Sequence, residues 1–187
     1  MTRHSEHGFT LVELLIVIVI VGIMTSMALP KSGIASYQAN SAARVVATVL
    51  SHAQRLAVSQ QSDVRVAFDV GTSQLRVHED RDNDNVIDGD ERVVFTSLPE
   101  GVSFGLGVAA PRDMGSEVVN FTRTQDGLPV LAFHRDGTTS ENGGVYLSTV
   151  AGLAVGREVD VRAVEIARAT GRAQWFSYAS RSWKAGV

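Results

Sequence analysis

An acidic segment from Asp80 to Glu91 carries the densest set of possible metal ligands in this sequence of 187 residues. Its carboxylates stand at alternate positions, Asp80, Asp82 and Asp84, and return at Asp88 and Glu91. This spacing matches a twelve-residue calcium loop, in which the last carboxylate closes the coordination shell with both oxygens. Because these carboxylates repel one another unless a cation neutralises them, we expect one calcium ion here. A solvated acidic turn between two strands is the alternative.

Two further positions of this segment bear on the calcium prediction. Val86 stands where such a loop supplies a backbone carbonyl, so it is an expected ligand through that oxygen. Asn85 stands where such loops have glycine, and asparagine accepts the left-handed conformation better than most residues. Because the flanking residues have strand patterns, the expected site is a calcium-binding hairpin rather than a helix–loop–helix motif.

A second residue that could have a chemical role is Glu13, the one carboxylate within the apolar stretch 9–29. About 20 apolar residues in a helix, at about 1.5 Å per residue, cross a hydrocarbon core of roughly 30 Å. A carboxylate at membrane depth is costly unless it is paired, which makes Glu13 a candidate functional residue. The stretch is too long for a secretory signal peptide, and no clear Ala-x-Ala site closes it.

Residues Gly8, Phe9 and Glu13, within Gly-Phe-Thr-Leu-Val-Glu, resemble the N-terminal motif of type IV prepilins, and Pro30 stands where pilins often carry a helix-bending proline. The resemblance implies that a prepilin peptidase cuts after Gly8 and that the new N-terminus, Phe9, is methylated. Cleavage places an ammonium group one helical turn from Glu13, so the carboxylate of one subunit can pair with the ammonium of its neighbour in a filament. Glu13 is therefore the expected assembly residue, and a plain membrane anchor is the alternative.

One long helix and many short strands must position these candidates. Between residues 39 and 57, apolar residues recur at three- and four-residue steps, which predicts an amphipathic helix lying on a sheet. We expect one helix from about Phe9 to about Gln60, bent or locally melted at Pro30. From Asp63 the period changes to two, and turn residues separate short segments of strand pattern. The expected strands are 63–69, 74–79, 92–97, 102–106, 117–121, 130–134, 145–149, 159–167 and 172–178.

A helix followed by many strands predicts an α+β fold in which the N-terminal helix packs on an antiparallel β-sheet. The Phe-His-Arg-Asp-Gly stretch at 133–137, a Gly-Gly hairpin and the Thr-Gly-Arg of 170–172 resemble the pseudopilin H and FimT-type group of minor pilins. The resemblance implies the pilin fold, divided into four regions. These are a leader peptide at 1–8, a transmembrane and assembly helix at 9–30, the amphipathic second half of the helix at 31–62 and a β-rich globular domain at 63–187.

The C-terminal segment combines basic and aromatic residues, which suit contacts with a nucleic-acid backbone and with stacked bases. Its candidate DNA-binding residues are Arg172, Arg181 and Lys184. In FimT-type pilins a Gly-Arg-x-Arg element helps to bind DNA, but here Gln174 stands where the second arginine should be. The net charge of -3 also argues against DNA. Docking of this tail onto neighbouring subunits is therefore the favoured interpretation.

No feature of the sequence indicates an enzyme: there is no cysteine, and no Ser/His/Asp order or paired acid–base spacing stands out. The resemblance implies a minor pilin or pseudopilin, anchored by a single pass in the bacterial inner membrane with its globular domain in the periplasm. Its expected partners are the prepilin peptidase and other pilins or pseudopilins, in a filament or at its tip. A DNA-binding minor pilin for natural transformation is the alternative function. The sequence leaves open whether the machine is a type II secretion system or a type IV pilus.

Overall fold

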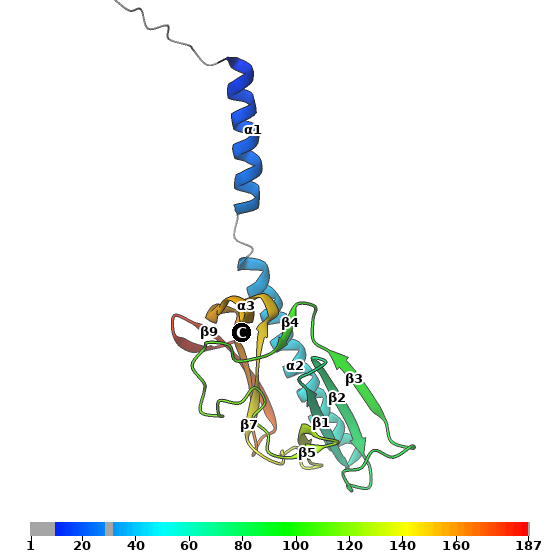
Figure 1. Ribbon diagram of the computed structural model, residues 1–187. Helices are drawn as coiled ribbons and strands as arrows, with labels where there is room; N and C mark the ends of the chain where they lie inside the picture. Colours follow the sequence, from blue (N-terminus) through cyan, green and yellow to red (C-terminus); the bar gives the residue numbers. More distant parts are fainter. Residues whose placement is uncertain (1–9, 29–31, 187) are drawn as a thin grey trace, which may run out of the picture. The chain divides into compact units, whose positions relative to one another are not determined.

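The computed structural model describes residues 10–28 and 32–186 (Figure 1). The chain divides into two compact units, Met1–Gly33 and Ile34–Val187. The first contains helix α1 (Leu11–Ala28), and the second contains helix α2 (Ser32–Gln60) from Ile34 onward together with every strand. The expected leader, the cleavage site at Gly8, the methylation site at Phe9 and the bend at Pro30 lie outside the described residues.

Helix α1 begins directly after Thr10, whose side-chain oxygen accepts a hydrogen bond from the backbone N–H of Glu13 at 3.2 Å. Thr-x-x-Glu is the spacing of a helix capping box, and a carboxylate in the first turn is favoured by the helix dipole. Large apolar side chains are exposed at consecutive positions, for example Leu14, Leu15 and Ile16, so apolar surface covers all sides of the helix. Within the described ranges, no helix is both long and apolar enough to cross a membrane.

Helix α2 confirms the predicted amphipathic pattern because its small and apolar residues form one buried stripe. The stripe consists of Ala39, Ala42, Ala43, Val46, Leu50, Ala53 and Ala57, all with 0% exposure. It belongs to a core that also includes Phe68 and Leu147, which lie on two different sheets. Figure 1 shows α2 running alongside the strands at 63–69 and 74–80, labelled β1 and β2.

The described residues also form ten strands, a short helix α3 (Val150–Val155) and one turn of 3-10 helix, η1 (Glu158–Asp160). The strands are β1 (Asp63–Asp69), β2 (Gln74–Asp80), β3 (Val93–Ser97), β4 (Val102–Phe104), β5 (Thr124–Gln125), β6 (Leu128–Phe133), β7 (Gly143–Thr149), β8 (Arg162–Ala167), β9 (Arg172–Ala179) and β10 (Ser182–Ala185). They form two antiparallel sheets with the orders β3-β2-β1-β6-β5 and β10-β9-β8-β7-β4. The predicted α+β class and the predicted hairpin, now β1 and β2, are confirmed.

One predicted strand, at 117–121, is wrong, and the one predicted at 159–167 starts only at Arg162, because η1 precedes it. The backbone N–H of Glu117 donates to the side-chain oxygen of Asn120 at 3.2 Å, and the Asn120 amide donates back to the Glu117 carbonyl at 2.7 Å. These local bonds turn the chain, in competition with a strand ladder. The segment forms only an isolated bridge, between Val119 and Val145.

A polar clamp fastens α2 to two turns of the β-region. The side-chain amide of Gln54 donates to the carbonyl of Gly137 at 2.7 Å and to that of Thr170 at 2.6 Å. Gly171, next in the chain, has φ = 59°, and a Cβ there would collide with the Gly137 carbonyl and the Gln54 amide. The clamp therefore requires glycine at 171 for two reasons, its backbone conformation and its close packing.

We expect Gly171→Ala to lower the free energy of unfolding more than Gly127→Ala does. Gly127 also has a positive φ, but its Cβ would meet open space, so alanine there pays only the conformational cost of about 1–2 kcal/mol. Gly171→Ala adds a steric cost of about 1–3 kcal/mol against the clamp. Urea unfolding of the full chain in detergent, followed by circular dichroism, measures both. Equal losses in the two variants would contradict a packing role for Gly171.

Candidate functional site

The three candidate DNA-binding residues do not converge. Arg172 begins β9, Arg181 lies in the turn between β9 and β10, and Lys184 lies on β10 opposite Ser177. All three cations are exposed. Strand β9 spans 8 residues. At about 3.3 Å per residue it separates Arg172 from the turn by about 25 Å, so these three cations do not form one compact patch.

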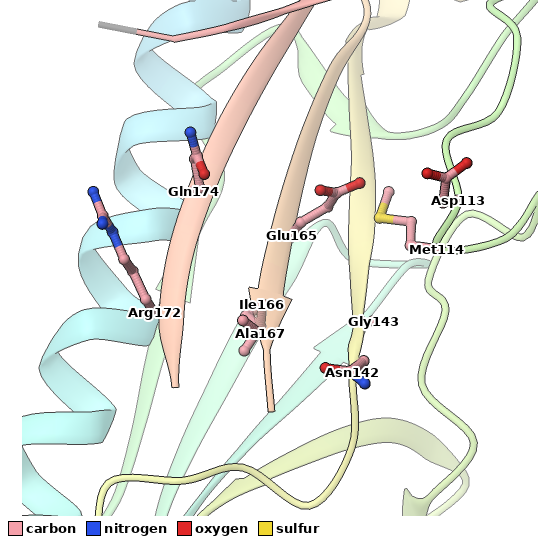
Figure 2. Close-up of a pocket in the computed structure, with 9 residues that line it drawn as sticks. All are labelled: Asp113, Met114, Asn142, Gly143, Glu165, Ile166, Ala167, Arg172 and Gln174. Atoms are coloured by element: carbon pink, nitrogen blue, oxygen red, sulfur yellow. The ribbon is translucent and has the colours of Figure 1, made fainter. Parts of the chain in front are cut away.

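The surroundings of Arg172 carry negative charge as well. Arg172 lines an open pocket of about 380 Å³ on the second sheet, together with Asp113, Glu165 and Gln174 (Figure 2). In Figure 2, Arg172 and Asp113 lie at opposite ends of the pocket, with Glu165 between them. Arg112 already pairs with Glu165, so two arginines and two carboxylates balance here, and the surface is not basic enough to attract a phosphate backbone.

The C-terminal aromatic residues are used in packing rather than presented as a stacking surface. The guanidinium of Arg112 lies 3.7 Å from the centre of the Phe176 ring. Trp183 packs edge-on against Tyr178 with ring centres 5.0 Å apart, and its indole N–H donates to the Ala110 carbonyl at 2.9 Å. The loop that contains Ala110 and Arg112 therefore engages the rings that base stacking would need.

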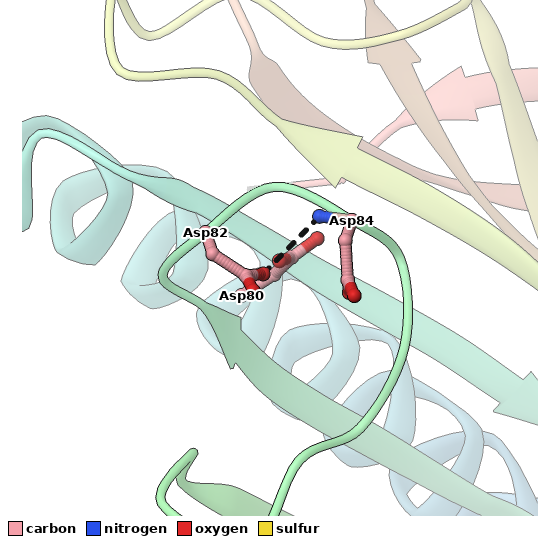
Figure 3. Close-up of side chains that lie close together, drawn as sticks. All are labelled: Asp80, Asp82 and Asp84. Atoms are coloured by element: carbon pink, nitrogen blue, oxygen red, sulfur yellow. Dashed lines mark hydrogen bonds between the residues drawn. The ribbon is translucent and has the colours of Figure 1, made fainter.

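The acidic segment links β2 to β3 at one end of the first sheet (Figure 3). Asp80 ends β2 and is fully buried, whereas Asp82 and Asp84 are exposed on the loop. Carboxylate oxygens of the three aspartates lie within 4.8 Å of one another. The structure therefore brings together the first three of the predicted calcium ligands.

The loop backbone turns around these carboxylates. The N–H of Asn85 donates to Oδ2 of Asp80 at 3.2 Å, and the N–H of Val86 donates to Oδ1 of Asp84 at 2.7 Å. Figure 3 marks a third bond, from the N–H of Asp84 to Oδ1 of Asp82 at 3.3 Å. Asn85 has φ = 68°, the left-handed conformation that the calcium-loop pattern requires at this position.

Glu91, at the far end of the segment, makes a different set of contacts. Its carboxylate lies 2.6 Å from Nε2 of His78 and accepts the backbone N–H groups of Arg81 at 2.7 Å and Asp88 at 3.2 Å. Burial raises the pKa of Glu91, but these hydrogen bonds outweigh it and hold the pKa below its ordinary value. Glu91 therefore closes the loop by itself, a role that the sequence interpretation did not foresee.

Asp88 and Glu91 are not members of the aspartate group that the described residues form. Desolvation, followed by the charges of Asp84 and Asp82, raises the pKa of Asp88. The charges of the aspartate group therefore act on this carboxyl, although Asp88 is not a member of the group. Their roles as calcium ligands, like that of the Val86 carbonyl, stay predictions.

A buried polar network beneath the loop was also missed. His78 is fully buried, and the amide nitrogen of Gln125 donates to its Nδ1 at 3.0 Å and to the Asn85 carbonyl at 3.1 Å. Arg76 donates to the amide oxygen of Gln125 at 3.1 Å, which fixes the orientation of that amide. Since Nδ1 of His78 must accept, its Nε2 carries the hydrogen that points to Glu91. No local sequence signal connects Gln125 to this loop.

The last candidate, Glu13, is exposed on α1. Its backbone N–H bonds to the Thr10 side chain, which orders the first turn of the helix. The carboxylate therefore extends from a defined position in the first turn of an apolar helix.

Comparison with known families gives two matches. The family described as "Prokaryotic N-terminal methylation motif" matches residues 3–29, and the family described as "Type II transport protein GspH" matches residues 42–170. No curated protein sequence matches the chain significantly.

Two solved structures of the minor pseudopilin EpsH from the type 2 secretion system of Vibrio cholerae are similar to this chain, each at 15% identity. One alignment covers 78% of this chain and 93% of that chain with a TM-score of 0.34. The other covers 80% and 94% with a TM-score of 0.41.

Glu91→Gln should lower the free energy of unfolding by about 1–2 kcal/mol at neutral pH, because its charge-assisted bonds become neutral ones. Urea unfolding of the full chain in detergent with a chelator measures the change. Glu100→Gln, in an exposed turn after β3, is the matched control and should stay within about 0.5 kcal/mol of the wild type. A Glu91 variant as stable as this control would show that the carboxylate does not close the loop.

Proposed function

Since this chain belongs to the GspH family of type II transport proteins and carries the prokaryotic N-terminal methylation motif, it is a minor pseudopilin of type II secretion, and we propose that Glu13 is the residue through which it joins other pseudopilins. The observation that carries the proposal is the surface of α1. This helix is apolar on all sides and has a single carboxylate, which lies in its first turn. A helix that is apolar all round must be covered, either by lipid or by other helices.

The first cover is the bacterial inner membrane. The apolar sequence 9–29 holds about 20 residues, the length that a single pass requires. The unit Ile34–Val187 then stands in the periplasm, where the other pseudopilins meet it. Within the pseudopilus, helices of neighbouring subunits replace the lipid around α1.

The prepilin peptidase prepares the chain for this exchange. Cleavage after Gly8 frees the amino group of Phe9, which stays cationic when it is methylated. Glu13 of one subunit pairs with that ammonium on its neighbour, so that each charge compensates the other where water is absent. The same carboxylate also favours the first turn of α1 through the helix dipole, so an experiment must separate the two effects.

Glu13→Gln removes the charge with little change in shape. We expect it to reduce co-purification with partner pseudopilins by roughly tenfold or more, because one buried ammonium per contact loses its counter-ion. Membrane insertion and cleavage should be unchanged. The measurement is affinity capture from detergent extracts, with the partner pseudopilins quantified by mass spectrometry.

The matched control is Thr10→Ala, which removes the side chain that caps α1 and keeps the carboxylate. It should cost helix stability of about 1 kcal/mol and leave capture close to wild type. If Thr10→Ala reduces capture as strongly as Glu13→Gln, then Glu13 acts through the helix terminus and not through pairing.

Gly8→Ala should leave residues 1–8 attached, since the peptidase cuts after this glycine. Intact-mass analysis of the membrane-extracted chain shows the difference directly. Ser5→Ala, elsewhere in the same leader, is the control and should be cut normally. A wild-type chain that retains Met1 in cells with an active peptidase would contradict the processing step.

A further inference from the structure

The loop between β2 and β3 concentrates negative charge that the protein itself only partly neutralises. Residues 80–91 contain six carboxylates and one arginine. Among the described residues, no ion pair involves Asp82 or Asp84. Their carboxylates accept backbone N–H groups of the loop, which supply no net positive charge.

Asp80 supplies the second and independent observation. Its side chain has 0% exposure, and Oδ2 is bound by the Arg65 side chain and by the N–H of Asn85. Its other oxygen, Oδ1, is buried and has no hydrogen-bond partner among the described atoms. A buried acceptor without a partner costs about 1–3 kcal/mol, more when it is charged, so this oxygen is a favourable position for a cation or another partner.

The spacing of the aspartate oxygens fits a calcium ion. Oxygens on opposite sides of calcium, each at about 2.3–2.6 Å, are separated by about 4.6–5.2 Å. The oxygens of Asp80, Asp82 and Asp84 lie within 4.8 Å of one another, so one ion can contact all three. Calcium tolerates an irregular shell that is completed by carbonyls and water, whereas magnesium requires a near-ideal octahedron.

We propose that Asp80, Asp82 and Asp84 bind one calcium ion at the end of β2, with the unpartnered Oδ1 of Asp80 as the buried ligand. Arg65 does not replace the ion. Its single positive charge compensates only one of the three aspartate charges, and it binds Oδ2 of Asp80, which leaves Oδ1 without a partner. Glu91 is not needed as a ligand, because His78 and two backbone N–H groups already occupy its carboxylate. The site is independent of Glu13 and of the assembly step.

The test uses the full chain in detergent, stripped with a chelator and then titrated with calcium chloride at constant ionic strength. We expect saturable binding by isothermal titration calorimetry with a Kd of about 0.1–1 mM, the range of extracellular calcium modules. The melting temperature should rise by about 3–6 °C at about 5 mM calcium. Magnesium chloride at the same concentration should give less than half of this shift.

Asp82→Asn and Asp84→Asn should each abolish the calcium-induced shift while melting like the wild type in chelator, since both side chains are exposed. Asp90→Asn, an exposed acid of the same loop outside the group, removes an equal charge and should keep the shift. Glu91→Gln should melt lower in chelator and still respond to calcium.

Three results would overturn the proposal. One is a wild-type chain that neither binds nor is stabilised by calcium at about 5 mM. Another is an Asp90→Asn variant that loses the shift as completely as Asp82→Asn, which would mean non-specific charge screening. The third is loss of the response in Glu91→Gln, which would replace the three-aspartate site by a shell that includes Glu91.

Discussion

The close packing of α2 on two sheets is the constraint on which the rest of the Ile34–Val187 unit depends. Alanines along the buried face of α2, such as Ala42, Ala43 and Ala53, let the strands approach the helix backbone closely. That approach brings the Gln54 amide within hydrogen-bond distance of two carbonyls in separate turns. Toward the other end of the helix, Arg162 on β8 donates to the Asn40 side chain at 2.7 Å. Apolar contact and polar clamps therefore support one another along the whole stripe.

The two sheets that share this core carry different chemistry on their remaining surfaces. The first sheet ends in the acidic loop, which follows β2. The antiparallel register of β1 and β2 sets Arg65 opposite His78 and diagonal to Asp80, so that Arg65 pairs with Asp80. The second sheet is covered on one side by a loop whose Arg112 lies over Phe176 and pairs with Glu165. Internal packing uses the aromatic rings that a nucleic-acid surface would need, which agrees with membership in a secretion family rather than a DNA receptor.

Features set by local periodicity could be predicted from the sequence. The three- and four-residue steps of α2 report one buried face, which is confirmed, and the alternation of β1 and β2 predicted the hairpin that the structure shows, although β1 is buried on both faces from Val64 to Phe68. The proximity of Asp80, Asp82 and Asp84 is local as well, since a turning loop gathers alternate side chains. Helix α3 was missed although its signals were present: Thr149 caps it at the start and Gly156 ends it in the left-handed conformation.

Features that depend on long-range register could not be predicted. The contact of Gln125 with His78 joins residues 47 positions apart, and it exists only because β1 and β6 pair side by side. The predicted role of Glu91 shows the same limit. Its position in the segment matches a calcium ligand, a role that stays a prediction, but nothing in the segment indicates that His78 lies beneath it.

The loop therefore has two ends with separate physical support. At one end, Glu91 binds the backbone and His78, and these bonds hold without any ion. At the other end, carboxylate oxygens of three aspartates lie within 4.8 Å of one another, and Oδ1 of Asp80 is buried without a hydrogen-bond partner among the described atoms. Because Arg65 and Glu91 already fix the base of the loop, a cation at the aspartates would order the tip rather than fold the domain. An effect of calcium on this subunit should thus be confined to the surface near β2 and β3.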